Sequence, residues 1–392
     1  MPQIPLPGTG GVPAGRGGGG VGSVRKYILM NKKIIIAGGG TGGHIFPAIA
    51  IANAIKALEP NTEFLFVGAT GKMEMEKVPQ AGYQIKGITI AGLNRSTLFK
   101  NLGLPLKLIK SFFQVRQIFK SFPPDAVIGV GGYSTLPVLR LAQAKGIPTF
   151  IHESNSFAGK ANLYLAKKAT KIYVAAEGMD KFFPADKLMI TGNPVRKAIA
   201  QASISKEEAL KHFGLDTGKQ TVLAIGGSLG AKSINDALAL NLEAFALNNL
   251  QLIWQTGKPN ADYYQSKAKG MNNIWVDSFI QDMDKAYAAA DLVISRAGAM
   301  SVTEICVAGK AAIFVPYPHA AEDHQTHNAQ TLVKRQAALM IKDADVKTLL
   351  VNKTIQLAKD PVSIHLFEKN SKAIAINNAD LLIAKNILNT IK

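Results

Sequence analysis

Cysteine is nearly absent from this chain of 392 residues, which contains only Cys306. One thiol can form neither an intramolecular disulfide nor a thiolate metal site, and such scarcity is typical of a reducing cytosol. Apolar runs of about 18 residues are also missing, so we expect no membrane-spanning helix. Aromatic residues make up 7% of the chain and do not alternate with basic clusters. Nucleic acid is therefore not an expected partner.

Acidic residues are scarce relative to basic ones, 27 against 45, which gives a net charge of +18. This excess indicates an acidic partner, either an anionic membrane surface or a highly phosphorylated substrate. The hydrophobic content of 47% predicts a globular protein, and the length predicts two domains. Residues 1–23 are rich in glycine and proline and lack the apolar stretch of a signal peptide. We expect residues 1–29 to be a disordered extension, with Met30 as the natural start.

A β-branched run at residues 34–36 leads into five glycines and then into an apolar segment, residues 48–58, with helical spacing. This pattern predicts strand, tight loop and helix, with an anion at the helix N-terminus. The glycine spacing also fits a dinucleotide site, but the next strand, residues 64–67, is not followed by the acid that would hold a ribose, which argues against NAD. His44 lies on the first helical turn, where both a packing role and a chemical role are open.

Alternating strands and helices continue with strands expected at residues 83–90, 125–129, 148–152, 171–174 and 187–191. A second glycine loop, Gly131-Gly132-Tyr133, follows the strand expected at residues 125–129. The polar residues Glu153 and Asn155 follow the strand expected at residues 148–152, at the strand end where ligands bind in open α/β sheets. Glu153 fits a ligand contact and a buried structural acid equally well. The break at residues 192–196 predicts a domain boundary.

Residues 93–105 form a loop that mixes apolar and basic side chains, among them Leu98, Phe99, Arg95 and Lys100. Packing and contact with an anionic bilayer are both consistent with this composition. The helix that follows should bury one apolar face, formed by Leu108, Phe112, Val115 and Phe119.

The second half repeats the alternation, with strands expected at residues 221–225, 252–254, 274–276, 292–294 and 313–315. Glycine and small-residue loops at 226–231 and 295–301 open helices. Three histidines and two acids lie within residues 319–324 and 327, but without a fixed ligand spacing, so we expect polar contacts to a sugar rather than a metal. Residues 371–391 read as one amphipathic helix that returns to the first domain.

Taken together, six motifs resemble the MurG family of glycosyltransferases from about Lys32 to the C-terminus: residues 38–44, 131–133, 152–155, 192–196, 226–231 and 295–299. The resemblance implies an α/β protein of the GT-B fold, with two Rossmann-like doubly wound domains facing a cleft. It implies an N-terminal acceptor domain at 30–193, a donor domain at 194–370, and a C-terminal helix at 371–392 that packs back on the first domain.

The activity implied by the resemblance is inverting transfer of N-acetylglucosamine (GlcNAc) from UDP-GlcNAc to the C4 hydroxyl of N-acetylmuramic acid (MurNAc) in undecaprenyl-pyrophosphoryl-MurNAc-pentapeptide. This reaction converts lipid I to lipid II for cell-wall peptidoglycan, and thereby serves cell shape and division. The expected location is the cytoplasmic face of the bacterial plasma membrane, bound peripherally to its anionic surface, with no cofactor. A UDP-GlcNAc 2-epimerase, or a glycosyltransferase with a soluble acceptor, is the alternative. The loop at 93–105 and the Gly131-Gly132-Tyr133 motif argue against it.

The resemblance also implies roles for single residues. His44 is the preferred general base and Glu153 its rival, although His44 could instead bind a pyrophosphate. The donor would contact Thr41, Gly42, Gly43, Asn155, Arg196, Ser228, Ile280, Ala299, Met300, Ser301, Glu304 and Gln325. Among these, Ile280 would meet uracil, Glu304 the ribose, and Asn155 and Gln325 the sugar. Gly131, Gly132 and Tyr133 would bind the acceptor.

Overall fold

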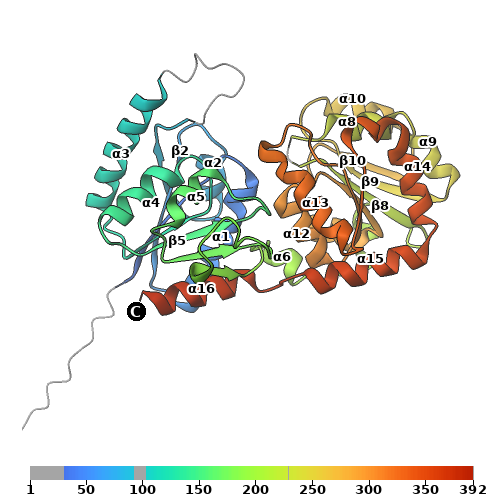
Figure 1. Cartoon of the computed structure of the whole chain (residues 1–392). Helices are drawn as coiled ribbons and strands as arrows, with labels where there is room; N and C mark the ends of the chain where they lie inside the picture. The colour runs from blue at the N-terminus through green and yellow to red at the C-terminus, as the bar shows by residue number, and fades with distance from the viewer. Residues whose placement is uncertain (1–30, 92–102, 228, 392) are drawn as a thin grey trace, which may run out of the picture. The chain divides into compact units, whose positions relative to one another are not determined.

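A computed structural model describes residues 31–91, 103–227 and 229–391 (Figure 1). All elements below belong to one compact unit, Lys32–Lys392. The predictions for the N-terminal extension, for Ser228 and for the loop residues Arg95, Leu98, Phe99 and Lys100 lie outside the described residues.

The first sheet is parallel, with its strands in the order β3-β2-β1-β4-β5-β6-β7. Ile34, Ile35 and Ile36 of β1 are almost completely buried, as expected for a parallel strand that is covered on both faces. The bounds are β1 Lys33–Ala37, β2 Glu63–Ala69, β3 Gln84–Ile88, β4 Ala126–Gly129, β5 Thr149–Glu153, β6 Lys171–Val174 and β7 Leu188–Ile190.

Helices connect these strands. The first, α1, begins at Gly42, so that His44 lies on its first turn as predicted and the last two glycines of the motif already belong to the helix. The bounds are α1 Gly42–Leu58, α2 Glu74–Gln80, α3 Leu104–Ser121, α4 Thr135–Ala144, α5 Lys160–Ala166, α6 Lys197–Ala200 and α7 Lys206–His212, with a 3₁₀ helix, η2, at Ala185–Lys187.

The second sheet is also parallel, in the order β10-β9-β8-β11-β12-β13. Its bounds are β8 Gln220–Ile225, β9 Leu250–Gln255, β10 Ile274–Asp277, β11 Leu292–Ser295, β12 Ala311–Phe314 and β13 Leu339–Met340. The helices are α8 Lys232–Ala239, α9 Leu242–Leu247, α10 Ala261–Lys267, α11 Met283–Ala289, α12 Ala299–Ala308, α13 His324–Lys334, α14 Val346–Ala358, α15 Pro361–Ile374 and α16 Ala379–Thr390, with 3₁₀ helices η3 Ala321–Asp323 and η4 Asp343–Asp345.

Strand order reverses once in each sheet, between β1 and β4 and between β8 and β11. In doubly wound sheets ligands bind outside the carboxyl ends of the strands at this switch point. The predicted fold of two doubly wound α/β halves is confirmed. The glycine loops predicted from the sequence, after β1, β4, β8 and β11, lie at the two switch points.

The C-terminal segment differs from the single helix predicted over residues 371–391. Residues 371–374 complete α15, the chain is non-helical at 375–378, and α16 begins at Ala379. Ala375 has an extended backbone, and Asn377 and Asn378 are poor helix formers. The return to the first half is nevertheless confirmed, because α16 packs beside α1 (Figure 1) and Tyr173 of β6 donates a hydrogen bond of 2.8 Å to Asn386.

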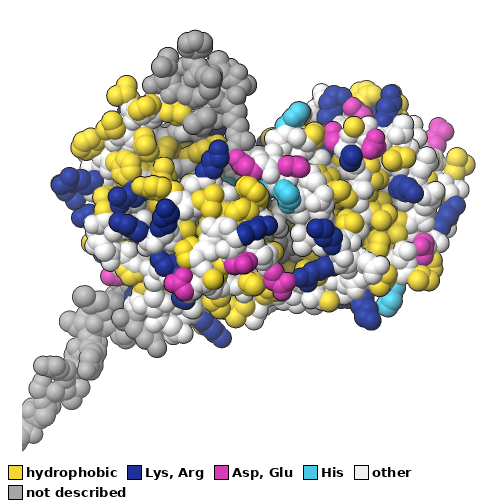
Figure 2. Space-filling model, in the orientation of Figure 1, with side chains coloured by type: hydrophobic (Ala, Val, Ile, Leu, Met, Phe, Trp, Pro, Cys, Tyr) yellow, Lys and Arg dark blue, Asp and Glu magenta, His cyan; other side chains and the backbone are white. Residues whose placement is uncertain are grey.

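Helix α3 has two apolar faces. The predicted face is confirmed, since Val115 and Phe119 are buried in the core of the first half. On the other side Leu106, Ile109 and Phe113 follow one another at helical spacing and are 72%, 55% and 65% exposed. Figure 2 shows hydrophobic side chains and basic side chains gathered over this helix. Among the described helices, none is both long and apolar enough to cross a membrane.

Candidate active site

The glycine loop after β1 has most of its amide groups occupied by protein. The Gly38 N–H donates to the Val67 carbonyl at 3.2 Å and the Gly39 N–H to the Gly131 carbonyl at 3.2 Å. The Gly40 N–H donates to the Glu74 carboxylate at 2.8 Å. An anion at this loop would therefore have to bind the first amides of α1, at residues 41–43, where the N-cap makes no side-chain hydrogen bond.

His44 on the first turn of α1 has a defined orientation. Its Nδ1 lies 3.0 Å from the Gly39 carbonyl oxygen. Because a carbonyl can only accept, Nδ1 carries the proton in the neutral ring and Nε2 is left as an acceptor. A Cβ at Gly131 would lie 2.7 Å from Nε2, and Gly131 has a φ of +95°. Gly131 thus lets the second loop approach the imidazole closely.

Gly132 has a similar reason to be glycine, because a Cβ there would lie 2.5 Å from the Gly39 carbonyl oxygen. The next residue, Tyr133, is 57% exposed. The two glycine loops of the first half therefore pack directly on each other around His44, and Tyr133 is left at the surface beside them.

Glu74 is a site residue that the sequence analysis missed. It is 1% exposed, and its second carboxylate oxygen accepts the Ala69 N–H at the end of β2 at 2.9 Å. A Cβ at Gly39 or at Gly68 would overlap the Glu74 side chain. The available signal was the pair of glycines, whose missing side chains leave room for a carboxylate next to the loop.

Glu153 at the end of β5 is 3% exposed and saturated with donors. Its Oε1 accepts the Asn155 N–H at 3.1 Å and the Asn155 side-chain amide at 3.3 Å. Its Oε2 accepts the Gly159 N–H and the Asn162 side-chain amide, both at 2.9 Å. These four bonds hold the loop at residues 154–160 in place. These bonds agree with the structural role of Glu153, one of the two roles that the sequence left open. Because the Asn155 side-chain NH₂ group is used by Glu153, its side-chain oxygen is the group left to accept a hydrogen bond from a ligand.

The neighbouring His152 is completely buried, and burial lowers its pKa to about 4. It is therefore neutral near pH 7. Its Nδ1 lies 3.4 Å from the Ser154 hydroxyl, which in turn donates to the Gly43 carbonyl at 3.4 Å. That carbonyl is available because Pro47, four residues on, has no N–H.

In the second half, the N-terminus of α12 is open. Ala299, Met300 and Ser301 form its first turn, and its N-cap, Gly298, is extended and gives no side-chain cap. Such a turn presents free N–H groups and the positive end of the helix dipole to an anion. The adjacent loop after β8 is tightly folded, because a Cβ at Gly230 would overlap the Thr256 carbonyl.

Ile280, predicted to meet a base through its backbone, already donates its N–H to the Gln255 side chain at 3.0 Å. Gln255 in turn donates to the Gly227 carbonyl at 3.0 Å. This side chain therefore links the chain after β10 to the loop after β8. In this conformation the Ile280 carbonyl, and not its N–H, is the backbone group left for a ligand.

Arg196 and Glu304, both of which the resemblance assigns to the donor, are brought together. The Arg196 Nε and a terminal nitrogen each donate to one Glu304 oxygen at 3.0 Å. Burial acts to lower the pKa of Arg196, but the Glu304 charge outweighs it and the pKa is raised. The guanidinium also lies 5.7 Å from the centre of the Phe46 ring. The pair fixes the start of α6 to α12.

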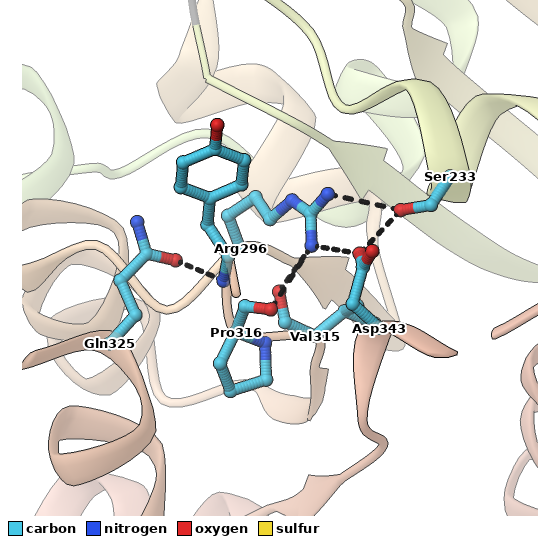
Figure 3. Close-up of polar contacts among 7 residues, drawn as sticks. Ser233, Arg296, Val315, Pro316, Gln325 and Asp343 are labelled. Carbon is cyan, nitrogen blue, oxygen red and sulfur yellow. Dashed lines mark hydrogen bonds and ion pairs between the residues drawn. The ribbon is translucent and has the colours of Figure 1, made fainter. Parts of the chain in front are cut away.

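Arg296, after β11, is the centre of a second network (Figure 3). It donates to the Val315 and Pro316 carbonyls at 3.1 and 3.2 Å. It also donates to Asp343 at 2.5 Å and to the Ser233 hydroxyl at 3.0 Å. One side chain thus joins the ends of β11 and β12 to η4 and α8.

Gln325 lies next to this network (Figure 3). Its Oε1 accepts the Tyr317 N–H at 2.9 Å, which fixes the orientation of the amide and turns its NH₂ group away from that contact. The Arg296 guanidinium lies 5.6 Å from the centre of the Tyr317 ring. Gln325 is therefore a preset hydrogen-bond donor.

Direct contacts connect the loop after β5 with α12 and α13. The Asn193 side-chain amide donates to the Ser154 carbonyl and to the Thr303 hydroxyl, both at 3.0 Å. The Ser156 N–H donates to Asn328 at 3.2 Å. These contacts bring the chain around Asn155 to the helices that begin near Ala299 and Gln325. In the described part of the chain, no group of three or more His, Cys, Asp or Glu residues could hold a metal ion.

Family models match both halves of the chain. Residues 34–174 match the glycosyltransferase family 28 N-terminal domain and residues 221–387 the corresponding C-terminal domain. A crystal structure of Acinetobacter baumannii MurG is similar with a TM-score of 0.72 and 28% identity, and covers 92% of this chain and 99% of its own. These similarities agree with the predicted GT-B fold.

Curated relatives named UDP-N-acetylglucosamine–N-acetylmuramyl-(pentapeptide) pyrophosphoryl-undecaprenol N-acetylglucosamine transferase are similar over nearly the whole chain. The relative from Phocaeicola vulgatus is 49% identical over 91% of this chain and 96% of its own length. The one from Cytophaga hutchinsonii is 48% identical over 92% and 97%. The chain therefore belongs to glycosyltransferase family 28, and the predicted resemblance to MurG is confirmed.

A UDP-GlcNAc 2-epimerase from Neisseria meningitidis is also similar, with a TM-score of 0.62 but only 13% identity over 91% of this chain and 100% of its own. At this identity the similarity concerns the fold alone. The epimerase alternative thus has no support beyond the architecture that both enzymes share.

Proposed function

We propose that this protein transfers GlcNAc from UDP-GlcNAc to the C4 hydroxyl of the muramyl sugar in undecaprenyl-pyrophosphoryl-MurNAc-pentapeptide. The observation that carries the proposal is the 49% identity to a transferase of this name over 91% of the chain. The geometry of His44 and the open N-terminus of α12 provide the chemistry that such a transfer requires.

The transfer is a single displacement with inversion at C1 of GlcNAc. The bond from C1 to the acceptor C4 oxygen forms while the bond from C1 to the UDP oxygen breaks, and UDP leaves with the electron pair. A base must take the hydroxyl proton. His44 suits this role because its Nε2 is the unprotonated nitrogen, fixed by the bond of Nδ1 to the Gly39 carbonyl at 3.0 Å. Glu153, the rival, already accepts four hydrogen bonds.

Charge on the departing diphosphate would be stabilised by the first turn of α12, at Ala299, Met300 and Ser301. Ser228, which lies outside the described residues, is proposed to contact the diphosphate as well. Arg196 provides positive charge nearby, although its bidentate pair with Glu304 makes it a shared group and not a free cation. Helix N-termini bind phosphates without a metal ion, so we propose no cofactor.

The remaining donor contacts follow from hydrogen-bonding capacity. Gln325 would donate to a GlcNAc hydroxyl through its NH₂ group, and Asn155 would accept one through its free oxygen. Glu304 has lone pairs left for the ribose hydroxyls, and the Ile280 carbonyl would meet uracil. The amides of Thr41, Gly42 and Gly43 would close on the donor from the first half. Gly131, Gly132 and the exposed Tyr133 would bind the acceptor.

We further propose that the protein acts at the anionic cytoplasmic face of the plasma membrane, where its lipid-linked acceptor would lie. The exposed stripe of Leu106, Ile109 and Phe113 supports this, because Lys110 and Lys120 lie on the same side of α3 and are exposed. Apolar side chains flanked by lysines suit the interface of an anionic bilayer. The acceptor domain would comprise 30–193, the donor domain 194–370, and the returning segment 371–392.

The proposal is tested by following labelled GlcNAc from UDP-GlcNAc into a lipid I analogue with a shortened prenyl chain. Wild type is compared with His44→Ala, and with His365→Ala as a control, since His365 is an exposed histidine on α15. Loss of a general base typically costs about 10²- to 10⁴-fold. We expect that loss for His44→Ala alone, with UDP binding unchanged. UDP-GlcNAc binding without transfer by the wild type would contradict the proposal, and formation of UDP-N-acetylmannosamine would instead support an epimerase.

A further inference from the structure

One peptide unit in the first glycine loop contacts two ionisable side chains. The Gly40 N–H donates to Glu74 at 2.8 Å. The carbonyl of the same peptide unit, that of Gly39, lies 3.0 Å from the His44 Nδ1. A buried carboxylate is thus connected to an imidazole through a single planar amide group.

We propose that Glu74 is a positioning residue for His44 and acts through the Gly39–Gly40 peptide unit. We call this arrangement of carboxylate, peptide unit and imidazole the Glu74–His44 bridge. The inference rests on the proposed function, in which His44 takes the acceptor proton. Glu74 itself contacts no substrate in this account.

Polarisation of the peptide unit explains how the bridge acts. A carboxylate that accepts a hydrogen bond from an amide N–H makes the carbonyl of that amide a stronger acceptor, because hydrogen bonds in a chain polarise one another. A stronger acceptor at Gly39 holds the proton on the His44 Nδ1 and keeps Nε2 as the lone-pair nitrogen. In serine proteases an aspartate does this by direct contact with the histidine. Here a peptide unit lies between the two groups.

The position of Glu74 is rigid enough for this role. Its other oxygen accepts the Ala69 N–H at 2.9 Å, so the carboxylate is held between the end of β2 and the loop. The chain approaches it closely on both sides, since a Cβ at Gly39 or Gly68 would overlap its side chain. Among the described contacts, backbone amides are the only hydrogen-bond partners of Glu74. Its charge is therefore directed at the two peptide units.

Competing contacts at His44 are weaker or neutral. The Thr41 hydroxyl lies 3.5 Å from Nδ1, farther than the Gly39 carbonyl. His152 of β5 interacts with His44 electrostatically, but it is completely buried with a pKa of about 4 and so carries no charge near neutral pH. Glu74 is thus the charged group whose contact leads to the proton-bearing nitrogen of His44.

The first experiment observes the His44 ring directly and needs no catalysis. The full-length protein is labelled with ¹⁵N-histidine, and His44 is assigned from the signal that disappears in His44→Ala. In the wild type at pH 8 we expect the chemical shifts of a ring protonated on Nδ1. In Glu74→Gln, which keeps the size of the side chain but removes its charge, we expect a mixture of the two tautomers.

Two further variants serve as controls. Glu76→Gln makes the same charge change two residues on, at a side chain that is 66% exposed, and should leave the His44 signal unchanged. Glu74→Asp keeps the charge but is one methylene too short to reach both amides, so it should also mix the tautomers. It replaces Glu74→Gln if thermal unfolding shows that the latter is not folded.

The second experiment is a double-mutant cycle on GlcNAc transfer. We expect Glu74→Gln to lower kcat by about 10- to 100-fold, the cost typical of removing an outer-shell partner that orients a metal-bound histidine. The KM for UDP-GlcNAc and the activity of Glu76→Gln should stay near wild type. In a His44→Ala background, Glu74→Gln should cause little further loss, because the two residues act as one unit.

The outcomes separate the bridge from the proposed function. Mixed tautomers together with a non-additive cycle support the bridge. A His44 signal that is unchanged in both folded Glu74 variants overturns it, as does a loss that multiplies in full with that of His44→Ala. If the wild type transfers no GlcNAc while the tautomer still follows Glu74, the bridge is supported and the proposed function is contradicted.

Discussion

Replacing Asp343 with alanine should destabilise the second half of the protein and disturb the donor side of the site. Asp343 carries the negative charge of the Arg296 network, and the two side chains are 23% and 12% exposed. Asp343→Ala leaves the guanidinium without its carboxylate partner and also removes an acceptor of the Ser233 hydroxyl, which lies 2.6 Å from Asp343.

The magnitude follows from burial and from the contacts that remain. Removing one partner of a fully buried pair costs about 3–5 kcal/mol. Arg296 keeps its bonds to the Val315 and Pro316 carbonyls and to Ser233, and Asp343 is partly exposed. We therefore expect a loss of about 2–3 kcal/mol of unfolding free energy, which corresponds to roughly 4–12 °C in Tm for a domain of this size.

Thermal unfolding with and without UDP is the assay, and Asp345→Ala is the matched control. Asp345 is an exposed acid two residues on, in the same 3₁₀ helix, and its removal makes the same charge change. Because Arg296 also holds the chain leading to Tyr317 and Gln325, which is proposed to contact the sugar, Asp343→Ala should further raise the KM for UDP-GlcNAc. A Tm shift of Asp343→Ala equal to that of Asp345→Ala would refute the reasoning.

Two further predictions concern the first half. The double variant Leu106→Ser, Phe113→Ser should bind anionic vesicles more weakly than the wild type, because each apolar side chain contributes about 1.5–3 kcal/mol when fully buried, but it should still use a soluble acceptor. Leu247→Ser, at an exposed leucine in the second half, is the control. Equal vesicle binding of all variants would contradict the prediction. His152 has a pKa of about 4 in the folded protein, against an ordinary value of 6.5, so on acidification the unfolded chain is protonated at this residue before the folded protein is. The stability that neutral His152 contributes is therefore fully present above pH 6.5 and is lost as the pH falls through 4. This amounts to up to roughly 3 kcal/mol, and urea unfolding of His152→Gln should show less of that loss than the wild type.

The strands and glycine loops could be predicted because their signals are local. The β-branched run at residues 34–36, for example, is buried and is followed by glycines at the carboxyl edge of the first sheet. The strand β13, only two residues long, has no such run and was missed. The break before Ala379 was also missed, since the amphipathic pattern runs through it.

The exposed stripe on α3 was visible in the sequence but was not used. Leu106, Ile109 and Phe113 are spaced by three and four residues, and on the other side the buried Ile118 and Phe119 lie three and four residues after Val115. Periodicity identifies both stripes equally well. It cannot say which of them meets the sheet, because that depends on the tertiary packing of the helix.

Polar networks of the site were the least predictable part. Glu74 is 34 residues from Gly40 in the chain, and Arg296 is 47 residues from Asp343. Neither pair has a motif at fixed spacing. In both cases the partners meet because parallel strands bring the ends of distant segments to one edge of the sheet.

The loops at the strand ends of the two halves are both rich in glycine and small residues, but their amide groups are used differently. The loop after β1 gives the N–H groups of Gly38, Gly39 and Gly40 to Val67, Gly131 and Glu74, so it holds an imidazole in place. The first turn of α12 has no side-chain cap and keeps its amides for a ligand. In the proposed mechanism, the carboxylate behind His44 would favour uptake of a proton, and the N-terminus of α12 would favour departure of an anion. The two halves would then provide the opposite electrostatic environments that the two ends of one displacement require.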